Sequence, residues 1–109
     1  MDTSRLQGIA QRLREHLEAK HQAREAALAS CREAIRLAAN SIRAAHRREF
    51  AEAQERLTEA RGRLAEARAA LSPHPDILYS GFFQDAAKEV AEAAITIALL
   101  SDSPVPEPE

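Results

Sequence analysis

The sequence predicts an all-α protein, and its composition, its hydrophobic periodicity and two breaks in the chain support that prediction. Alanine, glutamate, arginine and leucine dominate the 109 residues, whereas Gly occurs three times, Trp is absent and aromatic residues make up 4%. This composition favours long helices over β-sheets. The length suits one domain with a modest core. We expect three antiparallel amphipathic helices packed as a bundle over residues 1–100.

The first predicted helix covers about residues 3–47, with Asp2, Thr3 or Ser4 as its N-cap. Apolar and small residues recur along it at spacings of three and four, which places them on one helical face. They are Leu6, Ile9, Leu13, Leu17, Leu28, Cys31, Ile35, Ala38, Ile42 and Ala45. Lys20 and Arg24 interrupt this face, and charged groups there normally need partners. Cys31 is the single cysteine, and its place on the apolar face predicts a small buried hydrophobe.

The second predicted helix covers about residues 49–71 and follows a break at the sequence His-Arg-Arg-Glu, residues 46–49. Its apolar residues repeat without interruption at spacings of three and four, as in an antiparallel bundle or coiled coil. They are Phe50, Ala53, Leu57, Ala60, Leu64, Ala67 and Leu71. Pro73 and Pro75 end this helix, because proline cannot continue the hydrogen-bond ladder.

The third predicted helix covers about residues 76–100 and is apolar around most of its circumference. Two partner helices would leave part of that surface bare, so we expect further helices or a second subunit to cover it. The segment that follows, residues 101–109, is acidic and rich in proline. We expect this tail to be disordered.

A narrow polar band runs along the third helix and contains Asp85, Glu89 and Glu92 at spacings of i, i+4 and i+7. Carboxylates on one helical face suit Mg²⁺ or Mn²⁺, which prefer oxygen ligands. A metal ion held there could activate water or bind a phosphate. The alternative is an ordinary solvated face, with Lys88 as an ion-pair partner.

A basic stripe is predicted on the first helix, where Arg32, Arg36, Arg43 and Arg47 fall within about 60° of one another. The formal net charge is only −2, so contact with a nucleic acid would have to come from such a local stripe. Guanidinium groups bind phosphates in a bidentate way. The alternative is that these cations complement the dipole at the helix C-terminus. Aromatic residues are nearly absent from this helix, which argues against recognition by base stacking.

The cellular compartment is predicted from features that the sequence lacks. The first residues are charged throughout and contain no apolar core of a signal peptide. No apolar run approaches the roughly 20 residues that span a bilayer. With a single cysteine, a reducing compartment fits best. We therefore expect a cytoplasmic protein without a membrane partner.

Several segments, taken in order and spacing, resemble the translin family over roughly residues 5–100. They are residues 20–25, 31–33, 35–36, 42–43 and 46–47 in the first helix, residues 50–53 with Leu57 and Leu64 in the second, and residues 74–76 and 79–93 at the start of the third. The sequence is similar in particular to prokaryotic translin-like proteins and to translin-associated factor X. The resemblance implies an all-helical fold that assembles into closed oligomers and binds RNA and single-stranded DNA.

The resemblance to translin-associated factor X also implies an endoribonuclease that uses a divalent metal held by acidic residues. The E-x-x-E-A segment of that branch matches Glu89, Glu92 and Ala93, and plain translin lacks the acidic pair. By resemblance, Glu89 and Glu92 are the catalytic metal ligands for Mg²⁺ or Mn²⁺, and we add Asp85 from its place on the helical wheel. The residues expected to face nucleic acid are Arg24, Arg32, Arg36, Arg43, His46 and Arg47.

The resemblance covers only the N-terminal half of the family pattern, because family members continue with several more helices. One of those helices supplies a further acidic ligand. We therefore expect a translin-like nucleic-acid-binding protein that is either a metal-dependent endoribonuclease or a subunit of one, as a homo-oligomer or with another translin-like chain. The alternative is a non-catalytic helical module for oligomerisation or partner binding.

Overall fold

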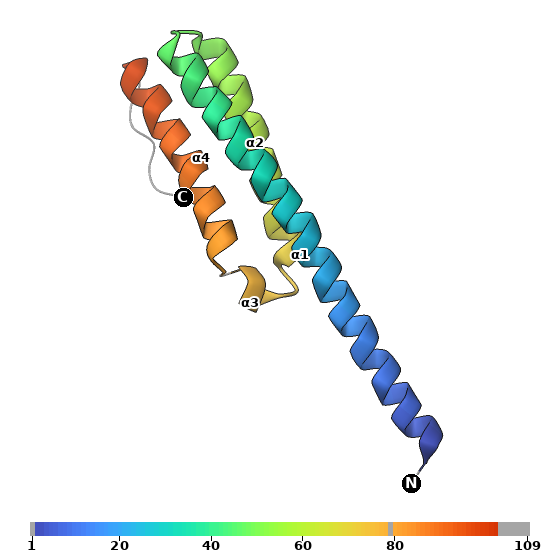
Figure 1. The fold of residues 1–109 in the computed structure, drawn as a ribbon. Coiled ribbons are helices and arrows are strands. Elements are labelled where there is room, and N and C mark those ends of the chain that lie inside the picture. The colour runs from blue at the N-terminus through green and yellow to red at the C-terminus, as the bar shows by residue number, and fades with distance from the viewer. Residues whose placement is uncertain (1, 79, 103–109) are drawn as a thin grey trace.

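The computed structural model describes residues 2–78 and 80–102, and these residues form four helices and no strand (Figure 1). The helices are α1 (Thr3–His46), α2 (Phe50–Leu71), α3 (Pro75–Leu78) and α4 (Gly81–Leu100). The all-α class predicted from composition is therefore confirmed for this part of the chain. From residue 103 onward, the predicted disordered tail lies outside the described residues.

The two ends of α1 follow the sequence signals closely. Asp2 is the N-cap, and its carboxylate accepts a hydrogen bond from the backbone N–H of Ser4. The predicted break appears after His46, where Arg48 adopts a left-handed backbone with φ of 62°. This conformation is uncommon for a residue with a side chain. It reverses the chain, so that α2 runs back along α1 (Figure 1).

The third predicted helix differs from the prediction, because the structure divides it in two. Instead of one helix over residues 76–100, α3 forms a single turn and α4 begins at Gly81. Ser80 lies between them with an extended backbone, φ −77° and ψ 163°, as the N-cap of α4. Serine favours this non-helical cap conformation, and glycine is a poor residue for a helix interior. The Ser-Gly pair at residues 80–81 was therefore the signal for the break.

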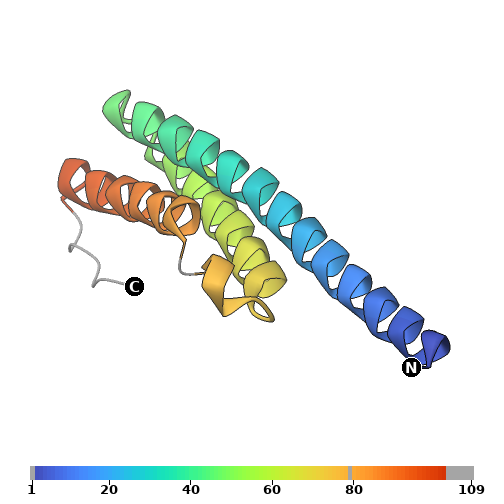
Figure 2. The same ribbon diagram turned by 60° about the horizontal axis from the view of Figure 1, so that its bottom comes forward.

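The three long helices pack against one another, with α4 lying along α1 and α2 (Figures 1 and 2). The buried positions of α1 and α2 are largely alanines, which let helix backbones approach closely. Larger buried side chains come mainly from α2 and α4. They include Leu57, Leu71, Phe83, Val90 and Ile97, each at most 2% exposed. Inside this core the hydroxyl of Ser41 donates a 2.8 Å hydrogen bond to the carbonyl oxygen of Ala53.

The N-terminal part of α1 projects beyond the other helices, and the described chain is accordingly elongated, 71 × 21 × 16 Å (Figures 1 and 2). We call residues 3–17 the arm and the packed remainder the body. The first buried residue along the described chain is Ala27. The apolar side chains of the arm are exposed to different degrees. Their exposed fractions are Leu6 49%, Ile9 39%, Leu13 59% and Leu17 63%.

The apolar face predicted for α1 is rotated slightly in the body. Cys31, Ala38 and Ala45 are buried as expected, and Ala27, Ala34 and Ser41 join them. Leu28 and Ile42 are half-buried at the edge of the core, and Ile35 remains exposed. The expectation that Ile35 belongs to the packed face is therefore wrong. The packed face is centred on small residues, because α2 approaches α1 where the side chains are short.

Candidate nucleic-acid interface and acidic face

The basic stripe of α1, made of Arg32, Arg36, Arg43 and Arg47, lies on the exposed surface of the body. Arg36 forms a two-pronged hydrogen-bonded ion pair with Glu33. A guanidinium nitrogen of Arg47 lies 3.1 Å from a carboxylate oxygen of Glu49 and 3.5 Å from one of Glu52. The negative charges beside Arg36 and Arg47 therefore already offset part of their positive charge.

Arg32 and Arg43 are the members of the stripe that have no ion pair within residues 2–78 and 80–102. Arg43 donates a hydrogen bond to the side-chain oxygen of Asn40, which is neutral. Both guanidinium groups are exposed, and His46 is exposed at the end of the same helix. The positive charge available to a ligand is therefore concentrated at Arg32 and Arg43.

The ion pairs beside the basic stripe lower the pKa values of the carboxyl groups that take part in them. The guanidinium of Arg36 lowers the pKa of the Glu33 carboxyl, mainly through their hydrogen bond. The Arg47 guanidinium likewise lowers the pKa of Glu49. Both carboxylates remain ionised well below neutral pH. Exposed pairs of this kind are weak, so a phosphate can compete for the same guanidinium groups.

Arg24, which we expected to face nucleic acid, is separate from the stripe. Its guanidinium carbon lies 5.8 Å from the ring centroid of Phe82, at the start of α4, and the group also pairs with Glu25 at 3.6 Å. Lys20, one turn earlier, forms an ion pair with Asp76 of α3. The two charged residues that interrupt the apolar face of α1 thus have partners. Both connect α1 to the segment that precedes or begins α4.

The acidic residues of α4 occupy one side of that helix. Asp85 and Glu92 are exposed, Glu89 is half-buried, and none of them forms an ion pair with another described residue. Glu89 and Glu92 are three residues apart and share a face. Within the described residues, no group of three or more histidine, cysteine, aspartate or glutamate side chains is placed to hold a metal ion. The assignment of these residues as metal ligands stays a prediction.

Two glutamates are nonetheless a chemically suitable partial ligand set for Mg²⁺ or Mn²⁺. Both ions prefer oxygen ligands. Mg²⁺ typically binds through one or two carboxylates and completes its shell with water and substrate phosphates. Glu89 and Glu92 supply that number of carboxylates on an accessible helix face.

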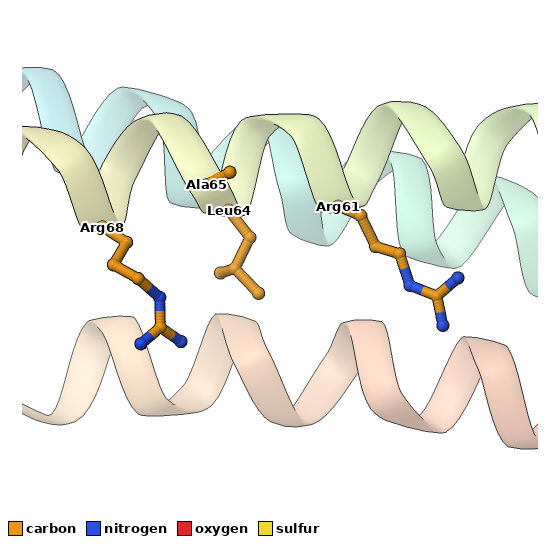
Figure 3. A pocket seen from close by; sticks show the side chains of 4 residues that line it. All are labelled: Arg61, Leu64, Ala65 and Arg68. Atoms are coloured by element: carbon orange, nitrogen blue, oxygen red, sulfur yellow. The ribbon is translucent and has the colours of Figure 1, made fainter. Parts of the chain in front are cut away.

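A shallow pocket on the side of α2 that faces α4 was not predicted from the sequence. It has a volume of about 180 Å³ and is lined by Arg61, Leu64, Ala65 and Arg68. Figure 3 shows the side chains of Arg61 and Arg68 reaching from α2 toward α4. The guanidinium carbon of Arg68 lies 5.2 Å from the ring centroid of Phe83. The available signal was the seven-residue spacing of the two arginines around Leu64, which places them on the same side of α2.

The single cysteine behaves as the sequence predicted. Cys31 is 3% exposed and has a free thiol. Burial raises the pKa of this thiol, so it is uncharged at neutral pH. Its role is therefore packing against the neighbouring helices.

Two further findings bear on function. Among the described residues, no helix is both long enough and apolar enough to cross a membrane. In comparisons with known proteins, the chain matches no family model, no curated protein and no solved structure.

Proposed function

We propose that this protein is a translin-like helical subunit that binds RNA or single-stranded DNA along the basic stripe of α1 and acts as an oligomer. The observation that supports this most directly is the exposure of all four arginines of the stripe on the body of α1. From Arg32 to Arg47 the stripe extends about 22 Å along the helix. That length is sufficient to follow several phosphates of one strand.

The proposed binding mode is contact with the phosphate backbone. The stripe offers guanidinium groups, and among the described residues the exposed side chains beside it include no Phe, Tyr or Trp on which a base could stack. Phosphate contacts position a nucleic acid but carry little sequence information. We therefore expect binding that is tolerant of sequence and strongly dependent on salt.

The test measures the affinity for a labelled single-stranded RNA over a series of salt concentrations. Replacing both Arg32 and Arg43 with Gln should weaken binding and reduce the slope of log K against log salt by about 1.4, because each lost contact to a single strand removes about 0.7. The matched control is Arg5→Gln with Arg12→Gln, which removes the same charge from the arm. An absence of RNA binding at low salt, or an equal effect of the control, would contradict the proposal.

We further propose that Glu89 and Glu92 hold Mg²⁺ or Mn²⁺ in an endoribonuclease site, alone or together with ligands from another subunit. Their spacing, accessibility and lack of ion-pair partners support this. A divalent ion bound there supplies Lewis acidity and lowers the pKa of a bound water. The two carboxylates would orient the ion, and the basic stripe would hold the strand that is cut.

The nuclease proposal has its own test. We expect Mn²⁺ binding, measured by calorimetry, and Mn²⁺-dependent cleavage of single-stranded RNA to be lost together in Glu89→Ala with Glu92→Ala. Glu55→Ala with Glu66→Ala is a control that removes two exposed carboxylates from α2. Cleavage that persists without Glu89 and Glu92 would reject the site while leaving RNA binding intact.

A second function, a non-catalytic oligomerisation or partner-binding module, is favoured by a separate observation. Leu13 and Leu17 in the arm, and Leu99 on α4, are each about three-fifths exposed, at 59%, 63% and 62%. Apolar surface of this kind commonly marks an interaction site. If the protein has only this second function, it assembles but has no affinity for RNA. The salt-dependent binding experiment therefore distinguishes the partner-binding module from the nucleic-acid-binding subunit.

A further inference from the structure

One heptad pattern runs along the whole of α1, through the exposed arm and the buried body. With alternating spacings of four and three, its positions are Leu6, Ala10, Leu13, Leu17, Lys20, Arg24, Ala27, Cys31, Ala34, Ala38, Ser41 and Ala45. Every position from Ala27 onward is buried, and none before it is. In the body, this face is covered by α2 and α4. In the arm, the same face continues past the end of those helices (Figures 1 and 2). At the end of the arm next to the body, the ring of His16, beside this face, lies 6.2 Å from the ring of His74, centroid to centroid. Leu13 and Leu17 on the face itself are 59% and 63% exposed.

We propose that the arm pairs with the arm of a second copy of this chain, as a short antiparallel coiled coil. The partner's arm would lie in line with α2, because α2 also runs antiparallel to α1 against this face. The contact would thus extend the interface that α1 and α2 already make in the body. This pairing names the surface through which the subunits of the proposed function associate. It rests on the proposed function only because both require the chain to form an assembly.

The side chains of the arm fit this pairing in one particular register. In an antiparallel coiled coil, residues at heptad position 'a' of one helix stack against residues at heptad position 'd' of the other. In the arm, Leu6 and Leu13 occupy 'd' positions, and Ala10 and Leu17 occupy 'a' positions. Leu6 then meets Leu17 of the partner subunit, and Ala10 meets Leu13 of the partner subunit. By two-fold symmetry, four layers form, and each layer contains at least one leucine.

The flanking positions are compatible with this register. In this register, the residues that border the stacked layers would also meet in pairs. Gln7 would lie beside Arg14 of the partner subunit, and Ile9 would lie beside His16 of the partner subunit. Neither pair sets like charges against each other, which would otherwise oppose the association.

A parallel pairing is excluded by the body of the same chain. A parallel partner helix would continue along the face of α1 from the arm toward Ala27, where α2 and α4 already lie. An antiparallel partner leaves at the opposite end, where the arm projects freely (Figure 1). The arm therefore accepts a second copy in one orientation only.

The first test measures mass in solution by sedimentation equilibrium with the full chain. The expected mass is at least twice the 12.0 kDa of the chain. Leu13→Glu should halve it, because the charge would enter two central layers. Gln11→Glu introduces the same charge on the opposite side of the arm and should leave the mass unchanged. A wild-type monomer at all concentrations, or an assembly unaffected by Leu13→Glu, overturns the inference.

The second test examines the register by disulfide formation. A mixture of the Ala10→Cys and Leu13→Cys variants should cross-link efficiently under oxidation, and neither variant alone should do so. Cys31 does not compete, because it is buried. Cross-linking of Ala10→Cys to itself would indicate parallel pairing and reject the proposed geometry. Both tests are independent of RNA, so a failure of nucleic-acid binding leaves their outcomes unchanged and the two proposals remain distinguishable.

Discussion

The arm and the body of α1 follow the same heptad pattern, yet they differ in both coverage and side-chain size. In the body, from Ala27 onward, the heptad positions are alanines with Cys31 and Ser41, and all are buried. In the arm, three of four positions are leucines, and all three are exposed. The periodicity alone would treat these two stretches as one continuous core.

The difference in side-chain size indicates two different partners. Small residues let α2 lie close to α1, and the hydroxyl of Ser41 reaches the backbone of α2 directly. Leucines fit helices separated by the usual 8–10 Å. The body is therefore built for a close contact within the chain, and the arm for a wider contact with another helix.

The largest difference should appear between two leucine truncations. Leu57→Ala in the body should lower the free energy of unfolding by about 2–5 kcal/mol, because Leu57 is 2% exposed and its removal leaves a cavity. Leu13→Ala in the arm should change it by no more than about 0.5 kcal/mol in the monomer, because that side chain is exposed. Urea unfolding at dilute protein concentration measures both. Equal losses would mean that the arm is packed within its own chain.

A smaller difference should separate two serine hydroxyls that donate to backbone carbonyls. Ser41→Ala removes a buried hydrogen bond between α1 and α2 and should destabilise the chain by about 1 kcal/mol. Ser72→Ala removes an exposed bond to the carbonyl of Ala69, where water replaces the hydroxyl, and should be nearly neutral. Thermal unfolding of the two variants compares them. A neutral Ser41→Ala would show that helix packing, and not this bond, sets the close approach.

The smallest effect is expected at the border between arm and body, where Lys20 pairs with Asp76. The ammonium of Lys20 lowers the pKa of the Asp76 carboxyl, chiefly through their hydrogen bond. The pair therefore stabilises the fold above the ordinary pKa of an aspartate, and this contribution is lost as the pH falls through the lowered value. We expect Asp76→Asn to be slightly less stable than wild type at neutral pH and equally stable in strong acid. An NMR titration in which Asp76 shows an ordinary pKa would contradict this.

The sequence predicted the helical elements well where the local signals were strong. The Asp2 cap, the break at residues 46–49 and the end of α2 before Pro73 all appear in the structure. The break at Ser80 was missed, because the strong apolar periodicity around it outweighed a two-residue cap signal. The face of α1 was slightly misplaced for a related reason. Large residues such as Ile35 dominate a hydrophobic pattern, whereas the packed face consists of alanines.

The surroundings of the candidate site residues could be predicted only in part. The exposure of Arg32 and Arg43 follows from their place opposite the apolar face, so the sequence could anticipate it. The aromatic partner of Arg24 could not be anticipated, because Phe82 lies far along the chain.

Local signals in the sequence were sufficient to predict the helical class, the helix ends that carry such signals, and the faces on which arginines, glutamates and leucines lie. These depend on propensities, caps and periodicity, which act over a few residues. Where α2 and α4 end along α1, and hence which part of the apolar face of α1 they cover, became visible only in the folded molecule. Coverage depends on the relative lengths and the packing of segments that are distant in the chain. The arm is consequently an extension of the core pattern that this chain does not itself bury.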